Sequence, residues 1–84
     1  MEHIEYTPHG VCARQLNFDL DDDGRIHNLS FTGGCNGNLK GIGKLVEGMK
    51  AEDVADRLEG NTCREKNTSC PDQLSKAIRE ALRH

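Results

Sequence analysis

Two stretches in the first half of the chain alternate between apolar and polar residues. In residues 12–21 the apolar positions are Leu16, Phe18 and Leu20, and the residues between them are small or polar. Residues 25–34 alternate in the same way, with Leu29 and Phe31 on the apolar side. A period of two residues is typical of a strand with one buried face. The pattern therefore predicts two strands that share a core.

A two-residue turn is predicted between these strands. Asp23-Gly24 suits a type I′ turn, because both central residues of that turn have a positive φ angle. If Asp22 faces Arg25, the register follows directly, and side chains opposite each other share a face. It pairs Leu16 with Phe31, Phe18 with Leu29, and Cys12 with Cys35, all on the apolar side of the hairpin.

The second half of the chain has apolar residues three and four positions apart, which is the spacing of helices packed on a core. Helices are predicted for residues 36–49, 51–59 and 70–82. Their apolar stripes contain Leu39, Ile42, Leu45, Val46 and Met49, then Val54 and Leu58, then Leu74, Ala77, Ile78, Ala81 and Leu82. Residues 3–7 predict a short additional strand. The expected fold is a single α+β domain over residues 1–84, in which an antiparallel hairpin, extended to three strands, packs against three helices in two layers.

The composition narrows the functional classes. Eleven basic and 14 acidic residues give a net charge of −3, and the chain has only one Tyr and two Phe. Neither a basic surface nor aromatic platforms for stacking bases are expected, so the composition argues against nucleic-acid binding. No apolar run is long enough to span a membrane, and the polar start Met1-Glu2-His3 does not resemble a signal peptide. We therefore expect a cytoplasmic protein without a membrane partner.

Four cysteines fall at the ends of predicted elements. Cys12 begins the first hairpin strand, Cys35 ends the second, Cys63 lies in a loop, and Cys70 opens the last helix. Cysteines in a reducing compartment are more often metal ligands or redox thiols than disulfides, and an 84-residue domain has a core small enough to benefit from a metal. The first hypothesis is a zinc site of these four thiolates. Alternatively, Cys12 and Cys35 are small apolar residues of the core.

The stretch "NTSCPD" at 67–72 has the signature of a helix N-terminus. Ser69 is the predicted N-cap, Asp72 its capping-box partner, and Pro71 part of the first turn. Capping does not require Cys70. The positive end of a helix dipole favours a thiolate at this position. A second hypothesis is therefore a redox module, with Cys70 as the nucleophile and Cys63 as the resolving thiol.

A third hypothesis concerns the glycine-rich stretch "GGCNGN" at 33–38. The backbone N–H groups of a turn that enters a helix can cradle a phosphate, and the candidates are Gly33, Gly34, Asn36 and Gly37. The alternative is that these glycines only allow a tight turn and a close approach of the helix. Gly41, Gly43 and Gly48, inside the predicted first helix, likewise favour close packing.

"TSCPD" at 68–72, together with "GGCNGN" and cysteines at 12 and 63, resembles the TSCPD domain family, specifically its small free-standing members, over nearly the whole chain. The resemblance implies a cysteine-bearing accessory module, because related domains form the C-terminal part of adenosylcobalamin-dependent ribonucleotide reductases. The resemblance implies a ribonucleotide reductase as a partner. It also implies that small members can themselves be classified as ribonucleoside-diphosphate reductases. Eighty-four residues cannot contain the radical-generating barrel or the cobalamin site, so the chain is not a complete enzyme by itself.

Taken together, the sequence favours a zinc module first, a thiol redox module second, and a nucleotide-binding or interaction domain third. A homodimer is compatible with the predicted N-terminal strand, whose free edge can pair with a second copy.

Overall fold

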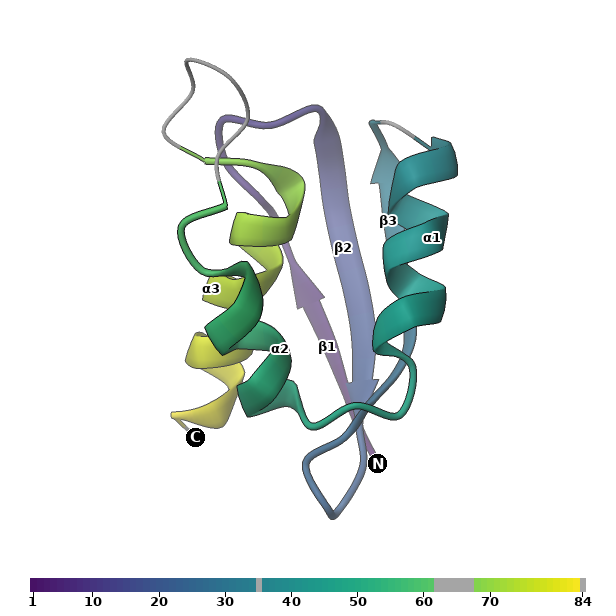
Figure 1. The fold of residues 1–84 in the computed structure, drawn as a ribbon, viewed down its shortest axis with the longest axis vertical. Coiled ribbons are helices and arrows are strands. Elements are labelled where there is room, and N and C mark those ends of the chain that lie inside the picture. Colours follow the sequence, from purple (N-terminus) through teal and green to yellow (C-terminus); the bar gives the residue numbers. More distant parts are fainter. Residues whose placement is uncertain (35, 62–67, 84) are drawn as a thin grey trace.

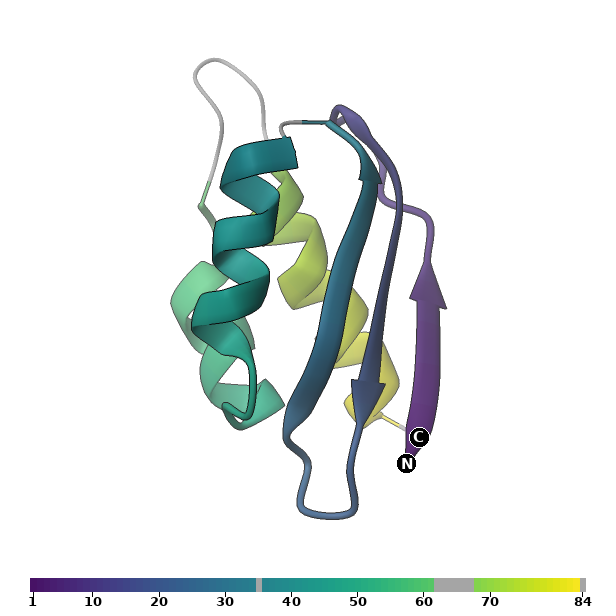
Figure 2. The same ribbon diagram turned by 90° about the vertical axis from the view of Figure 1, so that its right-hand side faces the viewer.

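The computed structural model describes residues 1–34, 36–61 and 68–83. It contains three strands, β1 (Glu2–Tyr6), β2 (Ala13–Leu20) and β3 (Ile26–Gly33), and three helices, α1 (Asn36–Val46), α2 (Ala51–Leu58) and α3 (Cys70–Leu82). The strands form one antiparallel sheet in the order β1-β2-β3. All three helices lie on one face of this sheet (Figures 1 and 2). This arrangement confirms the predicted α+β fold, including the third strand.

The core lies between the sheet and the helices. Alternate residues of β2 are buried, as the period of two predicts, and α3 places an apolar stripe against them. The fully buried large side chains are Leu16, Phe18, Ile26, Val54, Leu74 and Ile78. Leu45 does not join this core, because it lies one residue before the buried Val46 and so about 100° around α1. Leu45 is 77% exposed, and Leu82, in the predicted stripe of α3, is 45% exposed, so the prediction of both as core-facing residues was wrong.

The hairpin turn is longer than predicted. Asp21 N donates to the carbonyl oxygen of Arg25 at 3.1 Å, so these two residues face each other and three residues form the loop. The loop is a β-turn closed by Gly24 N and the Asp21 carbonyl oxygen at 3.0 Å, and Gly24 follows with a φ of 79°. The Asp21 carboxylate also accepts the N–H groups of Asp23 and Arg25 at 2.9 Å each. A three-residue loop ending in a left-handed glycine is a common hairpin connection, and Asp21 stabilises it here.

Two bulges then adjust the register. Asn28, with a φ of 57°, lies at a shift between the Asn17 and Asp19 pairings, and beyond it Leu16 pairs with Phe31 as predicted. The predicted pair of Phe18 and Leu29 lies at this shift. A bulge adds one residue to a strand and leaves the strand beyond it displaced by one position. The central register is therefore correct, although the turn that was expected to set it was wrong.

The second shift lies between Ala13 and Gln15 and changes the prediction for Cys12. Ala13 pairs with Gly33 and is buried, whereas Cys12 is exposed in the bend before β2. Because side chains alternate along a strand, one extra residue exchanges the inward and outward positions. The expectation that Cys12 lies on the apolar face was wrong, and so was the alternative that it is a core residue. Its predicted partner Cys35 lies outside the described residues.

Helix α1 ends earlier than predicted, at Val46, and two of its three expected packing glycines behave differently. Gly48 follows the helix with a φ of 79° and redirects the chain, so that Met49 reaches β3. A methyl group at Gly43 would come 3.1 Å from the carbonyl oxygen of Leu29, so this glycine does allow close approach. At Gly41 such a group would meet nothing within 4 Å. Only Gly43 confirms the expectation of close packing.

None of the described helices is both long enough and apolar enough to cross a membrane.

The different surroundings of Gly43 and Gly41 predict opposite effects of alanine. Gly43→Ala should destabilise the fold by about 1 kcal/mol or more, because its Cβ meets backbone that must shift. Gly41→Ala, in open space within the same helix, should stabilise it by about 0.5–1 kcal/mol, because alanine loses less backbone entropy than glycine. Urea unfolding followed by circular dichroism measures both. Equal stabilisation by the two substitutions would contradict the close contact between α1 and β3.

Candidate cysteine site

Residues 68–72 form the cap that begins helix α3. Ser69 has an extended backbone, with φ of −150° and ψ of 171°, and its hydroxyl oxygen accepts the backbone N–H of Asp72 at 3.1 Å. Pro71 lies in the first turn, where a backbone N–H has no partner within the helix. The predicted N-cap and the predicted helix start at Cys70 are both confirmed.

The carboxylate of Asp72 acts differently from a capping-box residue. It is buried, with 4% of the residue exposed, and it accepts the backbone N–H of Gly60 at 2.8 Å and the hydroxyl of Thr68. Burial acts to raise the pKa of Asp72, but the hydrogen bonds from Thr68 and Gly60, helped by Lys76, bring this pKa below its ordinary value. Asp72 therefore joins Gly60, two residues after the end of α2, to the first turn of α3.

The same cap joins the two sides of the segment that contains Cys63. The hydroxyl of Ser69 donates to the carbonyl oxygen of Asn61, and the side-chain nitrogen of Asn61 lies 3.4 Å from the Ser69 hydroxyl oxygen. Asn61 is the last described residue before positions 62–67, and Ser69 directly precedes Cys70. The cap thus closes the base of this segment next to Cys70.

The connection between β1 and β2 lies against this cap. Buried Gln73 donates to the Thr68 hydroxyl oxygen at 2.9 Å and accepts the backbone N–H of His9 at 3.0 Å. A methyl group at Gly10 would come 3.5 Å from the methyl carbon of Thr68. The loop that leads to Cys12 is therefore held beside the start of α3.

The structure locates two of the four predicted site cysteines. Cys12 is exposed and Cys70 is half-buried, and both are free thiols. Cys35 and Cys63 lie outside the described residues, so the predicted set of four zinc ligands and the pair Cys63–Cys70 stay predictions. In the part of the chain that is described, no three His, Cys, Asp or Glu side chains form a group that could hold a metal ion.

The glycine-rich turn before α1 has a conformational explanation. Gly33 and Gly34 have φ angles of 82° and 80°, which only glycine adopts readily. A side chain at Gly34 would also come 3.2 Å from the backbone nitrogen of Ala13 and from a methyl carbon of Leu39. Gly37 lies exposed within α1, with nothing within 4 Å of a substituted methyl group. Phosphate binding by Gly33, Gly34, Asn36 and Gly37 stays a prediction, and the first two glycines are needed for the turn itself.

A histidine between two carboxylates was not foreseen from the sequence. Nδ1 of His27 lies 2.6 Å from Glu47 and Nε2 lies 2.7 Å from Asp21. Hydrogen bonds to Asp21 first and Glu47 second raise the pKa of His27, and burial opposes them. Both ring nitrogens can donate at once only in the protonated imidazole. The charged ring therefore links the hairpin turn and β3 to the end of α1. Glu47 is 20 positions from His27, so local spacing gave no signal of this contact.

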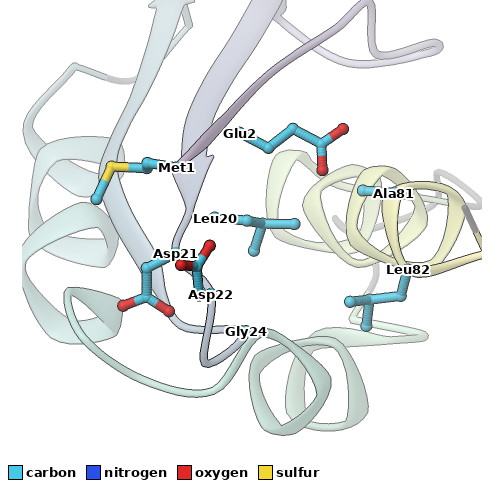
Figure 3. Close-up of a pocket in the computed structure, with 8 residues that line it drawn as sticks. All are labelled: Met1, Glu2, Leu20, Asp21, Asp22, Gly24, Ala81 and Leu82. Atoms are coloured by element: carbon cyan, nitrogen blue, oxygen red, sulfur yellow. The ribbon is translucent and has the colours of Figure 1, made fainter.

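These contacts lie at the hairpin-turn end of the sheet, as does a pocket of about 450 Å³ lined in part by Leu20, Asp22 and Leu82 (Figure 3). The cap of α3 and the bend at Cys12 lie at the other end (Figure 1). The charged histidine cluster and the two described cysteines, Cys12 and Cys70, therefore lie at opposite ends of the sheet.

The His27 contacts predict a pH-dependent stability. Because the pKa of folded His27 lies above its ordinary value of 6.5, its contribution is fully present below about pH 6.5 and is lost as the pH rises through the folded value. The free energy of unfolding, measured with urea between about pH 5.5 and 8.5, should fall with rising pH. His27→Gln should make this slope shallower. An unaltered slope in His27→Gln would contradict the contribution of this cluster.

The buried carboxylate predicts a large effect of removing it. Asp72→Ala leaves Gly60 N–H and the Thr68 hydroxyl without their acceptor, which should cost about 2–3 kcal/mol of unfolding free energy. Asp22→Ala, at an exposed position of the hairpin loop, is the matched control and should change stability by less than about 0.5 kcal/mol. Urea unfolding at pH 7 compares them. Similar losses in both variants would show that Asp72 does not have the structural role described.

The comparisons with known proteins give one finding. The family model of the TSCPD domain matches residues 1–82. Neither the curated proteins nor the solved structures contain a match to the chain. The matched range includes the motif "TSCPD" at 68–72, whose residues build the cap of α3, and it covers every described strand and helix. The chain therefore belongs to the TSCPD domain family.

Proposed function

We propose that this protein is a small accessory module that binds one zinc ion through Cys12, Cys35, Cys63 and Cys70 and assists a ribonucleotide reductase. The observation that carries the zinc proposal is that residues within two positions of each of the four cysteines contact one another at one end of the sheet. The link to ribonucleotide reduction rests on the family resemblance alone.

The first contact supports a pair of Cys12 and Cys35. Ala13 directly follows Cys12, and Gly34 directly precedes Cys35. A methyl group at Gly34 would come 3.2 Å from the Ala13 nitrogen, and Ala13 is paired with Gly33 across the sheet. The backbone is thus in close contact one residue away from each of these two cysteines.

The second contact supports a pair of Cys63 and Cys70. Asn61 precedes Cys63 by two positions, and Ser69 precedes Cys70 by one. These two residues are hydrogen-bonded to each other in the α3 cap. A ligand on each side of this junction would join the loop to the helix.

The third contact brings the two pairs together. Gly10, two positions before Cys12, lies against Thr68, two positions before Cys70. The hydrogen bond from His9 N to Gln73 supports the same approach. With Cys12 exposed and Cys70 half-buried, the two described thiols remain accessible to a metal ion.

Four thiolates form a closed tetrahedral zinc site, which has a structural role because no ligand position is left for a substrate. Such a site would cross-link the start of β2, the turn into α1, the 62–67 segment and the start of α3. The cap residues Thr68, Ser69 and Asp72 already have hydrogen-bonding roles. Cys70 is the residue of the motif that these roles leave for a ligand.

The proposal predicts about one zinc ion per chain when the protein is purified without chelator, as measured by elemental analysis. Removing zinc should lower the melting temperature by about 10 °C or more, because binding energy at a structural site contributes to folding. Cobalt(II) should replace zinc and give the intense thiolate-to-metal charge-transfer absorption of a tetrahedral cysteine site. Each single Cys→Ser variant should weaken this absorption.

The control is His9→Gln, which removes a nearby imidazole and should retain the metal. The proposal would be rejected if the protein is purified without metal and melts at the same temperature whether or not zinc is added. If Cys12→Ser keeps the metal and the other three Cys→Ser variants lose it, Cys12 is not a ligand and the site has three cysteines.

A second candidate function is supported by the hydrogen bonds between Asn61 and Ser69, which favour a redox pair of Cys70 and Cys63. In that case Cys70 attacks a disulfide of the partner, a mixed disulfide forms, and the Cys63 thiolate displaces the partner's second thiol. The module becomes oxidised as the partner is reduced. The same Cys12→Ser variant separates the two candidates. If the redox pair is correct, the variant keeps its thiol–disulfide exchange activity. If the zinc site is correct, the variant binds zinc more weakly.

A further inference from the structure

The two edges of the sheet are not equivalent. At the start of β3, Ile26 exchanges backbone hydrogen bonds with Gly48 and Met49, at 2.7 and 2.9 Å, and α1 packs along the strand. The outer edge of β1 has no strand or helix beside it among the described residues (Figure 2). Backbone N–H and C=O groups along a free edge favour pairing with another strand.

We propose that β1 pairs with β1 of a second copy to form an antiparallel homodimer, in which Ile4 lies opposite Ile4 of the second copy. The two three-stranded sheets would then form one six-stranded sheet with all helices on the same face. The occupant of the edge is inferred from the charge pattern of β1, and the proposal does not depend on zinc binding.

The register follows from symmetry and charge. In an antiparallel pair related by a two-fold axis, one residue lies opposite itself, and residues that face each other share a side of the sheet. Centring on His3 places two imidazoles opposite each other, and centring on Glu5 opposes two carboxylates. Centring on Ile4 places His3 opposite Glu5 of the second copy, twice. Of these three registers, only this one pairs His3 with a carboxylate twice and keeps all five residues of the strand opposite a residue of the second strand.

On the face of the sheet away from the helices, His3 is positioned for this pairing. Nδ1 of His3 lies 2.7 Å from Asp19 on β2, and its Nε2 lies 3.6 Å from Glu5 of the same chain. The hydrogen bond to Asp19 raises the pKa of His3, which favours its charged form. The exposed Nε2 side of the ring is available to a carboxylate that arrives across the free edge.

On the face of the sheet that the helices cover, this register places Glu2 opposite Tyr6 of the second copy. Glu2 pairs with Leu20 and lies on the same side of the sheet as Ala81 and Leu82 (Figure 3). Tyr6 lines a pocket of about 510 Å³ with three cations, Lys76, Arg79 and Arg83, and two carboxylates, Glu59 and Glu80. Arg79 is paired with Asp56 at 2.5 Å, and Lys76 lies 3.9 Å from Asp72. Among the described residues Arg83 is the cation of this pocket without an ion pair, so it is the one available to an incoming Glu2 carboxylate. Ile4 contributes the apolar centre of the interface.

The experiment is sedimentation velocity of the full chain over about 1–500 µM with a thiol reductant, because a five-residue interface is expected to give a weak dimer. Reductant removes disulfide-linked dimers through the exposed Cys12. A concentration-dependent dimer is expected. Glu5→Lys places two like-charged pairs at the interface and should raise the dissociation constant about tenfold or more. Glu52→Lys, the same charge change at an exposed position of α2, should leave it unchanged.

The register is tested by isotope-filtered nuclear Overhauser spectroscopy on a mixture of labelled and unlabelled protein. Contacts between Ile4 and Ile4, and between His3 and Glu5, across the two copies would support the proposal. A chain that remains monomeric at the highest concentration would overturn it. So would a dimer that is equally sensitive to Glu5→Lys and Glu52→Lys, or one whose intermolecular contacts exclude β1.

Discussion

The buried carboxylate of Asp72 organises the end of the molecule where α3 begins. Removing a carboxylate from water is costly unless hydrogen bonds replace its hydration, and Gly60 and Thr68 supply them. Through these bonds α3 is joined to Gly60, two residues after α2. Thr68 in turn binds Gln73, which holds the connection between β1 and β2. The packing of α3 on the sheet depends on this arrangement, since it sets the position of the first turn of the helix.

The cap also gives a physical meaning to the motif for which the family is named. Thr68, Ser69 and Asp72 form hydrogen bonds, and Pro71 fits the first turn of the helix. Four of the five residues therefore contribute to the structure of the helix start. No hydrogen bond of the cap involves Cys70, which is half-buried and directly follows Ser69, where the loop to Cys12 and residue Asn61 meet the helix start. This separation of roles is why the chemistry of the module is best sought in its cysteines.

The opposite end of the sheet is organised by charge. His27 is held between Asp21 and Glu47, and His3 is held by Asp19 on the neighbouring strand. In both cases a histidine is placed beside carboxylates on the surface, where its charged form is favoured by its neighbours. The first contact ties α1 to the hairpin, and the second leaves β1 with a charge pattern that a second copy can complement. The two ends thus differ in chemistry: the described cysteines Cys12 and Cys70 lie at one end, and the charged histidine contacts lie at the other.

Local patterns in the sequence determined the element order, the bounds of α3 and the N-cap at Ser69, because each depends on residues close together in the chain or on the alternation of side chains. The pairing of Leu16 with Phe31 was predicted correctly, but the bulge at Asn28, and not the predicted turn, produces it. The three-residue turn also has a local cause, because the Asp21 carboxylate accepts the N–H groups of Asp23 and Arg25, but the Asp23-Gly24 pattern pointed to a two-residue turn. The two bulges were decided by the pairing of β2 with β3. Asn28 adopts a left-handed conformation at one of them, and Cys12 is exposed beside the other. A single inserted residue exchanges the faces of a strand, so small backbone choices that periodicity does not encode decide which side chains can meet. The contacts of His27 with Glu47 and of Asp72 with Gly60 also join distant positions, and only packing brings those residues together.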